Sequence, residues 1–176
     1  MNISAVCLAF VLFSHVFLSA QTDRGGNTWY FGNKAGLRFE KDGPVTLTAG
    51  QMNTVEGCAT LSDKDGSLLF YTDGITVWGK DHKPLPNGTG LRGNASSTQS
   101  GVIVPDPADA MQYYVFTVDV MGGKAGFCYS KVDLRKNSGI GEVTTKNIPI
   151  RTMVTERLTA VRHQNGRDTW LVVHGI

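Results

Sequence analysis

The sequence predicts an all-β fold, organised as an incomplete antiparallel β-propeller of about two and a half to three WD40-like or YVTN-like blades. Three observations support this fold class. A nineteen-residue pattern occurs three times, each copy has turn residues between two apolar runs, and no segment beyond residue 20 keeps a 3.6-residue apolar period. The 21 glycines and six prolines fit a chain with many turns, so helix is expected to be scarce.

The three copies of the pattern start at Glu56, Ser100 and Glu156, which lie 44 and 56 residues apart. Asp-Gly and Asn-Gly pairs between apolar runs indicate tight hairpin turns, because both central residues take positive φ angles at low cost. Each copy is therefore predicted to be a β-hairpin, and the middle copy turns at 105–107 instead. The turn pairs and the aromatic residues that follow them are Asp65-Gly66 with Phe70, Asp109-Ala110 with Tyr114, and Asn165-Gly166 with Trp170.

The predicted hairpin strands are almost continuously apolar, which indicates that both of their faces are covered. They span 58–61 and 68–71, 101–104 and 113–116, and 158–161 and 170–173, with further strands at 75–78 and 126–130. Units that repeat every 40 to 50 residues, roughly, and bury their apolar surface against neighbours are typical of propeller blades. The alternative is a β-sandwich in which the three hairpins match by coincidence.

The first twenty residues are predicted to be a signal peptide. Residues 5–18 are almost wholly apolar yet short for a membrane span, and Ala20 offers a small residue before Gln21. An uncleaved anchor is the alternative. We expect residues 21–176 to form the partial propeller domain, without a membrane span, and to be exported through the periplasm to the outer cell surface or beyond.

Composition narrows the choice of partners. The net charge is +2 with both signs interspersed, and there is no basic stripe, so nucleic acid is not an expected partner. No motif for a metal ion or a cofactor occurs, and neither is expected. Cys58 and Cys128 fall in apolar strands of different repeats, where buried free thiols are favoured over a disulfide.

The chain is too short to form a closed propeller by itself. A propeller needs at least four blades of about 40 residues, more than residues 21–176 supply. We expect the chain to be the N-terminal part of a longer protein, whose last strand pairs with downstream blades. If the chain is complete, another chain or self-association must cover that apolar edge.

Several motifs resemble a known family. They are Trp29-Tyr30-Phe31-Gly32, Glu56-Gly57-Cys58-Ala59, 68–74 with Val77-Trp78, 96–100, 113–117 and 155–161. From about Asn27 to His174 the chain resembles the N-terminal propeller-like region of surface proteins that carry a gliding-motility-associated, type IX secretion sorting domain at the C-terminus. The resemblance implies export and an extracellular binding or adhesion role, and it implies no active site. The sorting domain itself has no counterpart in this sequence.

The candidate site residues are Glu56, Ser100, Glu156 and Arg157, at the starts of the three hairpins. In a propeller such positions can face the central tunnel, where two carboxylates could hold a cation or act as an acid and base pair. We favour the other interpretation, in which each carboxylate binds backbone N–H groups at a junction between blades, because the middle copy has serine there.

The turn-rich segment 79–99 is either a recognition loop or a structural crossing between blades. Taken together, these features predict an exported binding or adhesion module without catalysis, whose ligand is a glycan or a protein. The rival classes are a carbohydrate-active enzyme, a glycosidase or lyase with its site at the two glutamates, and a structural piece of a larger surface assembly.

Overall fold

The computed structural model describes residues 24–176, so the predicted signal peptide lies outside the described residues. In this part of the chain the structure is all-β, and the helical segments are the single turns η1 (Val120–Gly122) and α1 (Lys136–Gly139). All strand pairings are antiparallel, and none of the sheets closes on itself. The prediction of an antiparallel all-β fold with little helix is confirmed.

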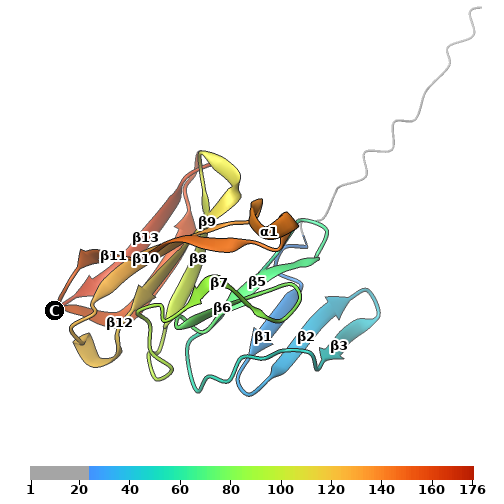
Figure 1. Cartoon of the computed structure of the whole chain (residues 1–176), viewed down its shortest axis with the longest axis horizontal. Helices are drawn as coiled ribbons and strands as arrows, with labels where there is room; N and C mark the ends of the chain where they lie inside the picture. The colour runs from blue at the N-terminus through green and yellow to red at the C-terminus, as the bar shows by residue number, and fades with distance from the viewer. Residues whose placement is uncertain (1–23) are drawn as a thin grey trace, which may run out of the picture.

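The strands of residues 24–176 form four sheets, each a meander of strands that follow one another along the chain. Figure 1 shows the first sheet at one end of the molecule and the last sheet toward the other. The four sheets are β1 (Thr28–Phe31), β2 (Ala35–Glu40) and β3 (Gly43–Leu47); β4 (Ala59–Ser62), β5 (Leu68–Thr72), β6 (Thr76–Gly79) and β7 (Pro84–Thr89); β8 (Gly101–Asp106), β9 (Asp109–Val118), β10 (Phe127–Asp133) and β11 (Glu142–Arg151); and β12 (Val154–Arg162) and β13 (Thr169–Gly175).

The three predicted hairpins are present, and each provides the first two strands of its sheet. They are β4–β5, β8–β9 and β12–β13. The aromatic residue of each copy lies on the second strand, where Phe70 pairs with Leu61, Tyr114 with Val104 and Trp170 with Val161. The further strands predicted at 75–78 and 126–130 correspond to β6 and β10.

The turns differ in detail from the prediction. Gly66 and Gly166 have φ angles of +88° and +70°, but Asp65 and Asn165 keep negative φ, so only the glycine is left-handed. In the first hairpin this gives a three-residue loop with a bulge, held because the Asp63 carboxylate accepts the amides of Asp65 and Ser67 at 2.9 Å. The middle hairpin turns at 107–108, and Asp109-Ala110 lies within β9.

The sheets stack face to face in sequence order, with one apolar cluster between each successive pair. The alternation of side chains along a strand explains how a middle sheet serves two neighbours, because Tyr71 of β5 packs on the first sheet while the adjacent Phe70 packs on the third. Burying each such side chain stabilises the fold by about 1.5–3 kcal/mol. The clusters contain Tyr30, Met52, Tyr71 and Trp78; Phe70, Val77, Leu85, Leu91, Val115, Val132, Leu134 and Val143; and Val118, Phe127, Val154 and Leu158.

The stacking aligns the first strands of the sheets. β1 contacts β4, β4 contacts β8 and β8 contacts β12, while β7 and β11 meet at the opposite edge of the middle two sheets. The segment 79–99 is thus not wholly a loop. It contains β7, the outer strand of the second sheet, and its Leu85 and Leu91 are buried in the core.

The two outward faces of the stack are not covered within the described residues. On β12–β13 the side chains of Val161, Trp170 and Val172 are more than half exposed, whereas Leu171 and Val173 on the opposite face pack on the third sheet. Within the described residues, both faces are thus covered in β4–β5 and β8–β9, while one face of β12–β13 is exposed.

Candidate functional site

The three repeat starts meet around the segment 97–100. Glu56 precedes β4, Ser100 precedes β8 and Glu156 lies in β12, and these three strands are neighbours in the stack. The amide of Gly57 donates to the carbonyl of Ser97 at 3.1 Å, which brings the first repeat start against this segment. The Glu156 carboxylate binds Thr98 from the other side. Residues far apart in the sequence therefore form one junction of three sheets.

Glu156 binds backbone groups at this junction. Its Oε2 accepts the Thr98 amide at 2.8 Å and the Thr98 hydroxyl at 3.1 Å, and its Oε1 accepts the Met121 amide at 2.7 Å. The donated amides, first that of Thr98, lower the pKa of the carboxyl group below its ordinary value. Glu156 thus has the capping role that we favoured, and it is ionised and occupied by donors at neutral pH.

Ser100 is fully buried and structural. Its Oγ accepts the amide of Asn94 at 3.1 Å. There is no space beside it, because a Cβ on Gly57 would lie 2.2 Å from the Ser100 nitrogen and a Cβ on Gly74 would lie 2.2 Å from the Ser100 Oγ. These glycines permit the close approach of backbones that the junction requires. Ser100 does not face an open tunnel.

Glu56 and Arg157 are exposed. Within residues 24–176, neither side chain makes a hydrogen bond or an ion pair, and the Arg157 amide donates to the Thr155 hydroxyl at 3.3 Å. Arg157 lines a shallow pocket of about 290 Å³ together with Thr98, Met121, Thr155 and Glu156. The structure thus separates the four candidates into two structural side chains and two that are free to meet a ligand.

Two further residues at this junction were not predicted. The Gln99 side chain accepts the Leu158 amide at 2.7 Å, which adds a second link from the segment 97–100 to β12. Met121 has left-handed angles, φ 52° and ψ 35°, and its side chain is 89% exposed. The loop around it is held at both ends, because Asp119 accepts the amides of Val120 and Ala125 at 2.8 and 3.1 Å. No local motif in the sequence indicates these contacts.

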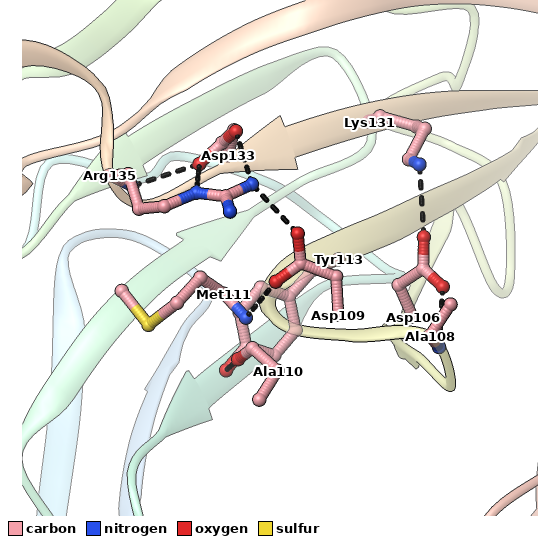
Figure 2. Close-up of polar contacts among 9 residues, drawn as sticks. All are labelled: Asp106, Ala108, Asp109, Ala110, Met111, Tyr113, Lys131, Asp133 and Arg135. Carbon is pink, nitrogen blue, oxygen red and sulfur yellow. Dashed lines mark hydrogen bonds and ion pairs between the residues drawn. The ribbon is translucent and has the colours of Figure 1, made fainter.

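A second polar cluster includes Asp106, the last residue of β8, and so lies at the opposite end of this strand from Ser100. Figure 2 shows its contacts. Arg135 donates to both carboxylate oxygens of Asp133, at 3.0 and 2.8 Å, and to Asp109 at 2.7 Å. Beside it Lys131 pairs with Asp106 at 2.9 Å. The Arg135 guanidinium lowers the pKa of Asp133 to about 2. All these charged groups are paired with one another. The cluster therefore has a structural role, in which ion pairs hold the 106–109 turn against the end of β10.

The cysteines are free thiols, as predicted, but only Cys128 is buried, while Cys58 is partly buried against the cluster between the first and second sheets. Burial raises the pKa of both thiols, and Cys128 is buried completely. Among residues 24–176, no cluster of three or more His, Cys, Asp and Glu side chains could hold a metal ion. No helix in the same range is long and apolar enough to cross a membrane.

Comparisons of the chain with protein-family models, with curated proteins and with solved structures gave no match. The resemblance to the surface proteins with a type IX secretion sorting domain therefore stays a prediction.

Proposed function

We propose that the chain is an exported binding or adhesion module, without catalysis of its own, that recognises a glycan or a protein through the exposed residues of the repeat-start junction. The observation that carries this proposal is the Met121 loop. Glu156 and Asp119 accept hydrogen bonds from the backbone amides of this loop. The Met121 side chain is exposed to solvent and lines the same pocket as Arg157, whose guanidinium is free.

Backbone strain supports a binding role for this loop. A residue other than glycine in the left-handed region costs about 1–3 kcal/mol and persists only where surrounding contacts impose it, commonly at ligand sites. Here two carboxylates supply those contacts. Because the loop is already ordered, a ligand would not need to order it, which favours affinity.

The two exposed side chains suit recognition. Methionine offers a polarisable apolar surface that adapts to different partners, and arginine offers several directed donors that match carboxylates or the hydroxyl groups of a sugar. Loops on a rigid β scaffold commonly carry such groups. The expected export and the resemblance to cell-surface proteins agree with a ligand outside the cell.

Glu156 supports a binding role over a catalytic one. A general acid needs a raised pKa and a free proton to donate, whereas the Glu156 carboxylate accepts three hydrogen bonds that lower its pKa. In the rival glycosidase or lyase, replacing Glu56 and Glu156 together by glutamine would abolish a measurable glycan-cleaving activity in a chain that stays folded. Such a loss would overturn the binding-only proposal.

We infer further that the four sheets are blades of a β-propeller. The stacking in sequence order and the side-by-side first strands support this, because propeller blades follow one another around an axis with their first strands innermost. A crystal structure in which the hairpins belong to two sheets packed face to face, as in a β-sandwich, would contradict it.

Binding is tested by presenting residues 21–176 to arrays of immobilised glycans and extracellular proteins. For each ligand that binds, Arg157→Ala and Met121→Ser are expected to weaken binding by about tenfold or more, as hot-spot residues do. The matched controls are Arg167→Ala and Val55→Ser, because Arg167 and Val55 are exposed and lie outside the pocket. Equal losses in the controls, or no ligand on either array, would refute the proposed site.

Export is tested separately. The full chain, expressed in a bacterium with an outer membrane, is expected in the periplasm or beyond it with Gln21 as its first residue, as cell fractionation and mass spectrometry of the N-terminus would show. A protein that stays in the cytoplasm and begins with Met1 would contradict export without bearing on the binding surface.

A further inference from the structure

A polar cleft lies between the end of the first sheet and the β4–β5 turn of the second sheet. It has a volume of about 290 Å³ and is lined by Arg24 and Asn27, by residues 38–40 of β2 and by residues 65–67 of the turn. No residue of this lining belongs to the pocket beside Arg157. The cleft is therefore a separate feature from the junction of the repeat starts.

The strand β2 directs charged side chains into this cleft. Arg38 pairs with Thr28 across β1 and β2, so their side chains lie on the same face of the sheet. Thr28 is buried on that face, and its hydroxyl donates to the Gly66 carbonyl in the β4–β5 turn at 3.2 Å. Arg38, and Glu40 two residues further along the strand, therefore face this turn. Neither residue belongs to the apolar cluster between the two sheets.

Backbone hydrogen bonds hold the walls of the cleft together. The Arg24 amide donates to the Lys64 carbonyl in the β4–β5 turn at 3.0 Å, and the Asn27 amide donates to the Arg24 carbonyl at 2.9 Å. Asn27 is bound to β2 in turn, because the Phe39 amide donates to its carbonyl at 2.8 Å and its side-chain amide donates to the Phe39 carbonyl at 3.0 Å. The cleft thus exists before a ligand arrives, which reduces the cost of binding.

Polar groups of the lining have hydrogen-bonding capacity to spare within residues 24–176. Arg38 and Glu40 form an ion pair at 2.6 Å that uses only one of the two carboxylate oxygens of Glu40. The other side-chain groups with no partner among these residues are the Arg24 guanidinium, the Asn27 carboxamide oxygen, the Asp65 carboxylate and the Ser67 hydroxyl. Donors and acceptors therefore line the same small space.

We propose that this cleft binds a neutral sugar ring. Its two guanidinium groups balance its two carboxylates, so the lining carries no net charge that would attract an anion or a cation. The hydroxyl groups of a sugar both donate and accept hydrogen bonds, which matches a lining of charged donors and charged acceptors. The volume lies at the lower end of the range for ligand pockets and suits a single ring.

The test adds the methyl glycosides of glucose, galactose, mannose and N-acetylglucosamine to residues 21–176, which contain every described sheet and core cluster. Backbone amide resonances are followed by NMR. At least one glycoside is expected to shift the resonances of 24–27, 38–40 and 65–67 and to leave those of 155–158 unchanged. The uronic acid and the amino sugar derived from that glycoside are expected to bind more weakly, because each brings a charge that the lining does not neutralise.

Arg24→Ala and Asp65→Ala are each expected to weaken binding by about tenfold, because each removes a charged hydrogen-bonding partner of the sugar. Asp65→Asn should weaken binding less than Asp65→Ala, since a carboxamide still binds hydroxyl groups. Arg167→Ala is the matched control, because Arg167 is 70% exposed and lies outside the cleft. Arg157→Ala should also leave sugar binding unchanged, which separates this cleft from the ligand site at the junction.

Amide spectra that no neutral glycoside changes would overturn the proposal, as would tighter binding of the uronic acid or of the amino sugar. Sugar binding that survives in both Arg24→Ala and Asp65→Ala would place the ring outside the cleft, and so would an equal loss in Arg157→Ala. Unchanged resonances far from the cleft check that every variant is folded.

Discussion

The carboxylate of Glu156 holds Thr98 by two hydrogen bonds, one from the backbone amide at 2.8 Å and one from the hydroxyl at 3.1 Å. This contact ties β12 to the segment that leads into β8, across 58 residues of sequence. Because the same carboxylate also binds the Met121 amide at 2.7 Å, one side chain joins the last sheet, the start of the third sheet and the exposed loop.

We expect Glu156→Ala to lower the free energy of unfolding by about 1–3 kcal/mol, because backbone donors lose a charged acceptor. Urea denaturation measures the change. Glu56→Ala is the matched control, since Glu56 occupies the equivalent repeat position without a partner in the described residues, and its effect should stay within about 0.5 kcal/mol. A similar decrease in unfolding free energy in both variants would show that the hydrogen bonds of Glu156 do not stabilise the junction.

Asp133 is expected to make stability depend on pH in the acid range. Its pKa falls to about 2 in the folded chain, chiefly through the Arg135 guanidinium, while an unfolded aspartate titrates near its ordinary value of 3.8. The stabilisation is therefore complete above pH 4, roughly, and is lost as pH falls toward 2. Asp133→Asn should flatten the dependence of unfolding free energy on pH in this window, and Asp42→Asn, at an exposed turn, should leave it unchanged. Glu156 and Asp106, whose pKa values are also lowered, maintain part of the slope, so a slope as steep in Asp133→Asn as in the unaltered chain would contradict this assignment.

Phe70 and Trp170 should differ sharply in their contribution to stability although they occupy the same repeat position. Phe70→Ala opens a cavity between two sheets and should cost about 3–5 kcal/mol. Trp170→Ala, measured at a concentration at which the chain is monomeric, should change the unfolding free energy by less than about 1 kcal/mol. Equal costs would mean that Trp170 is covered within a single chain.

Gly57→Ala should destabilise the chain by about 1–3 kcal/mol. The reason is steric, because a Cβ there would lie 2.2 Å from the backbone nitrogen of Ser100, and neither backbone can move without opening the junction. Gly26→Ala is the control, since nothing lies within 4 Å of its Cβ position. Thermal unfolding of the two variants compares them, and a neutral Gly57→Ala would argue against the close approach.

Cys58 and Cys128 should react slowly with Ellman's reagent in the folded chain at pH 8 and rapidly in guanidinium chloride. Burial removes them from the reagent and raises the pKa of both thiols, so little thiolate is present. Cys128, which is fully buried, should be the slower of the two, as Cys58→Ser and Cys128→Ser variants would resolve. Two unreactive cysteines after denaturation without reductant would indicate a disulfide instead.

The hairpins could be predicted from the sequence because their determinants are local. The Asp65-Gly66 and Asn165-Gly166 pairs lie between apolar runs, and this pattern specifies a reversal of the chain whatever surrounds it. The strand β7 was missed because Pro84 and Pro86 suggest a loop, while the burial of Leu85 against the third sheet makes it a strand. The left-handed Met121 was missed because no neighbour in sequence requires it.

The sequence alone therefore determines the three repeated hairpins and the strands β6 and β10, because side-chain alternation and turn chemistry act over a few residues, whereas β1, β2, β3, β7 and β11 were not predicted from it. Only the tertiary structure decides whether residues at equivalent positions of the repeat are buried to the same degree and make the same hydrogen bonds. Stacking buries Phe70, leaves Trp170 in water, gives Glu156 three donors and gives Glu56 no partner in the described residues. The repeat supplies the same residue types at each start, but contacts between distant segments depend on which sheets flank each copy in space.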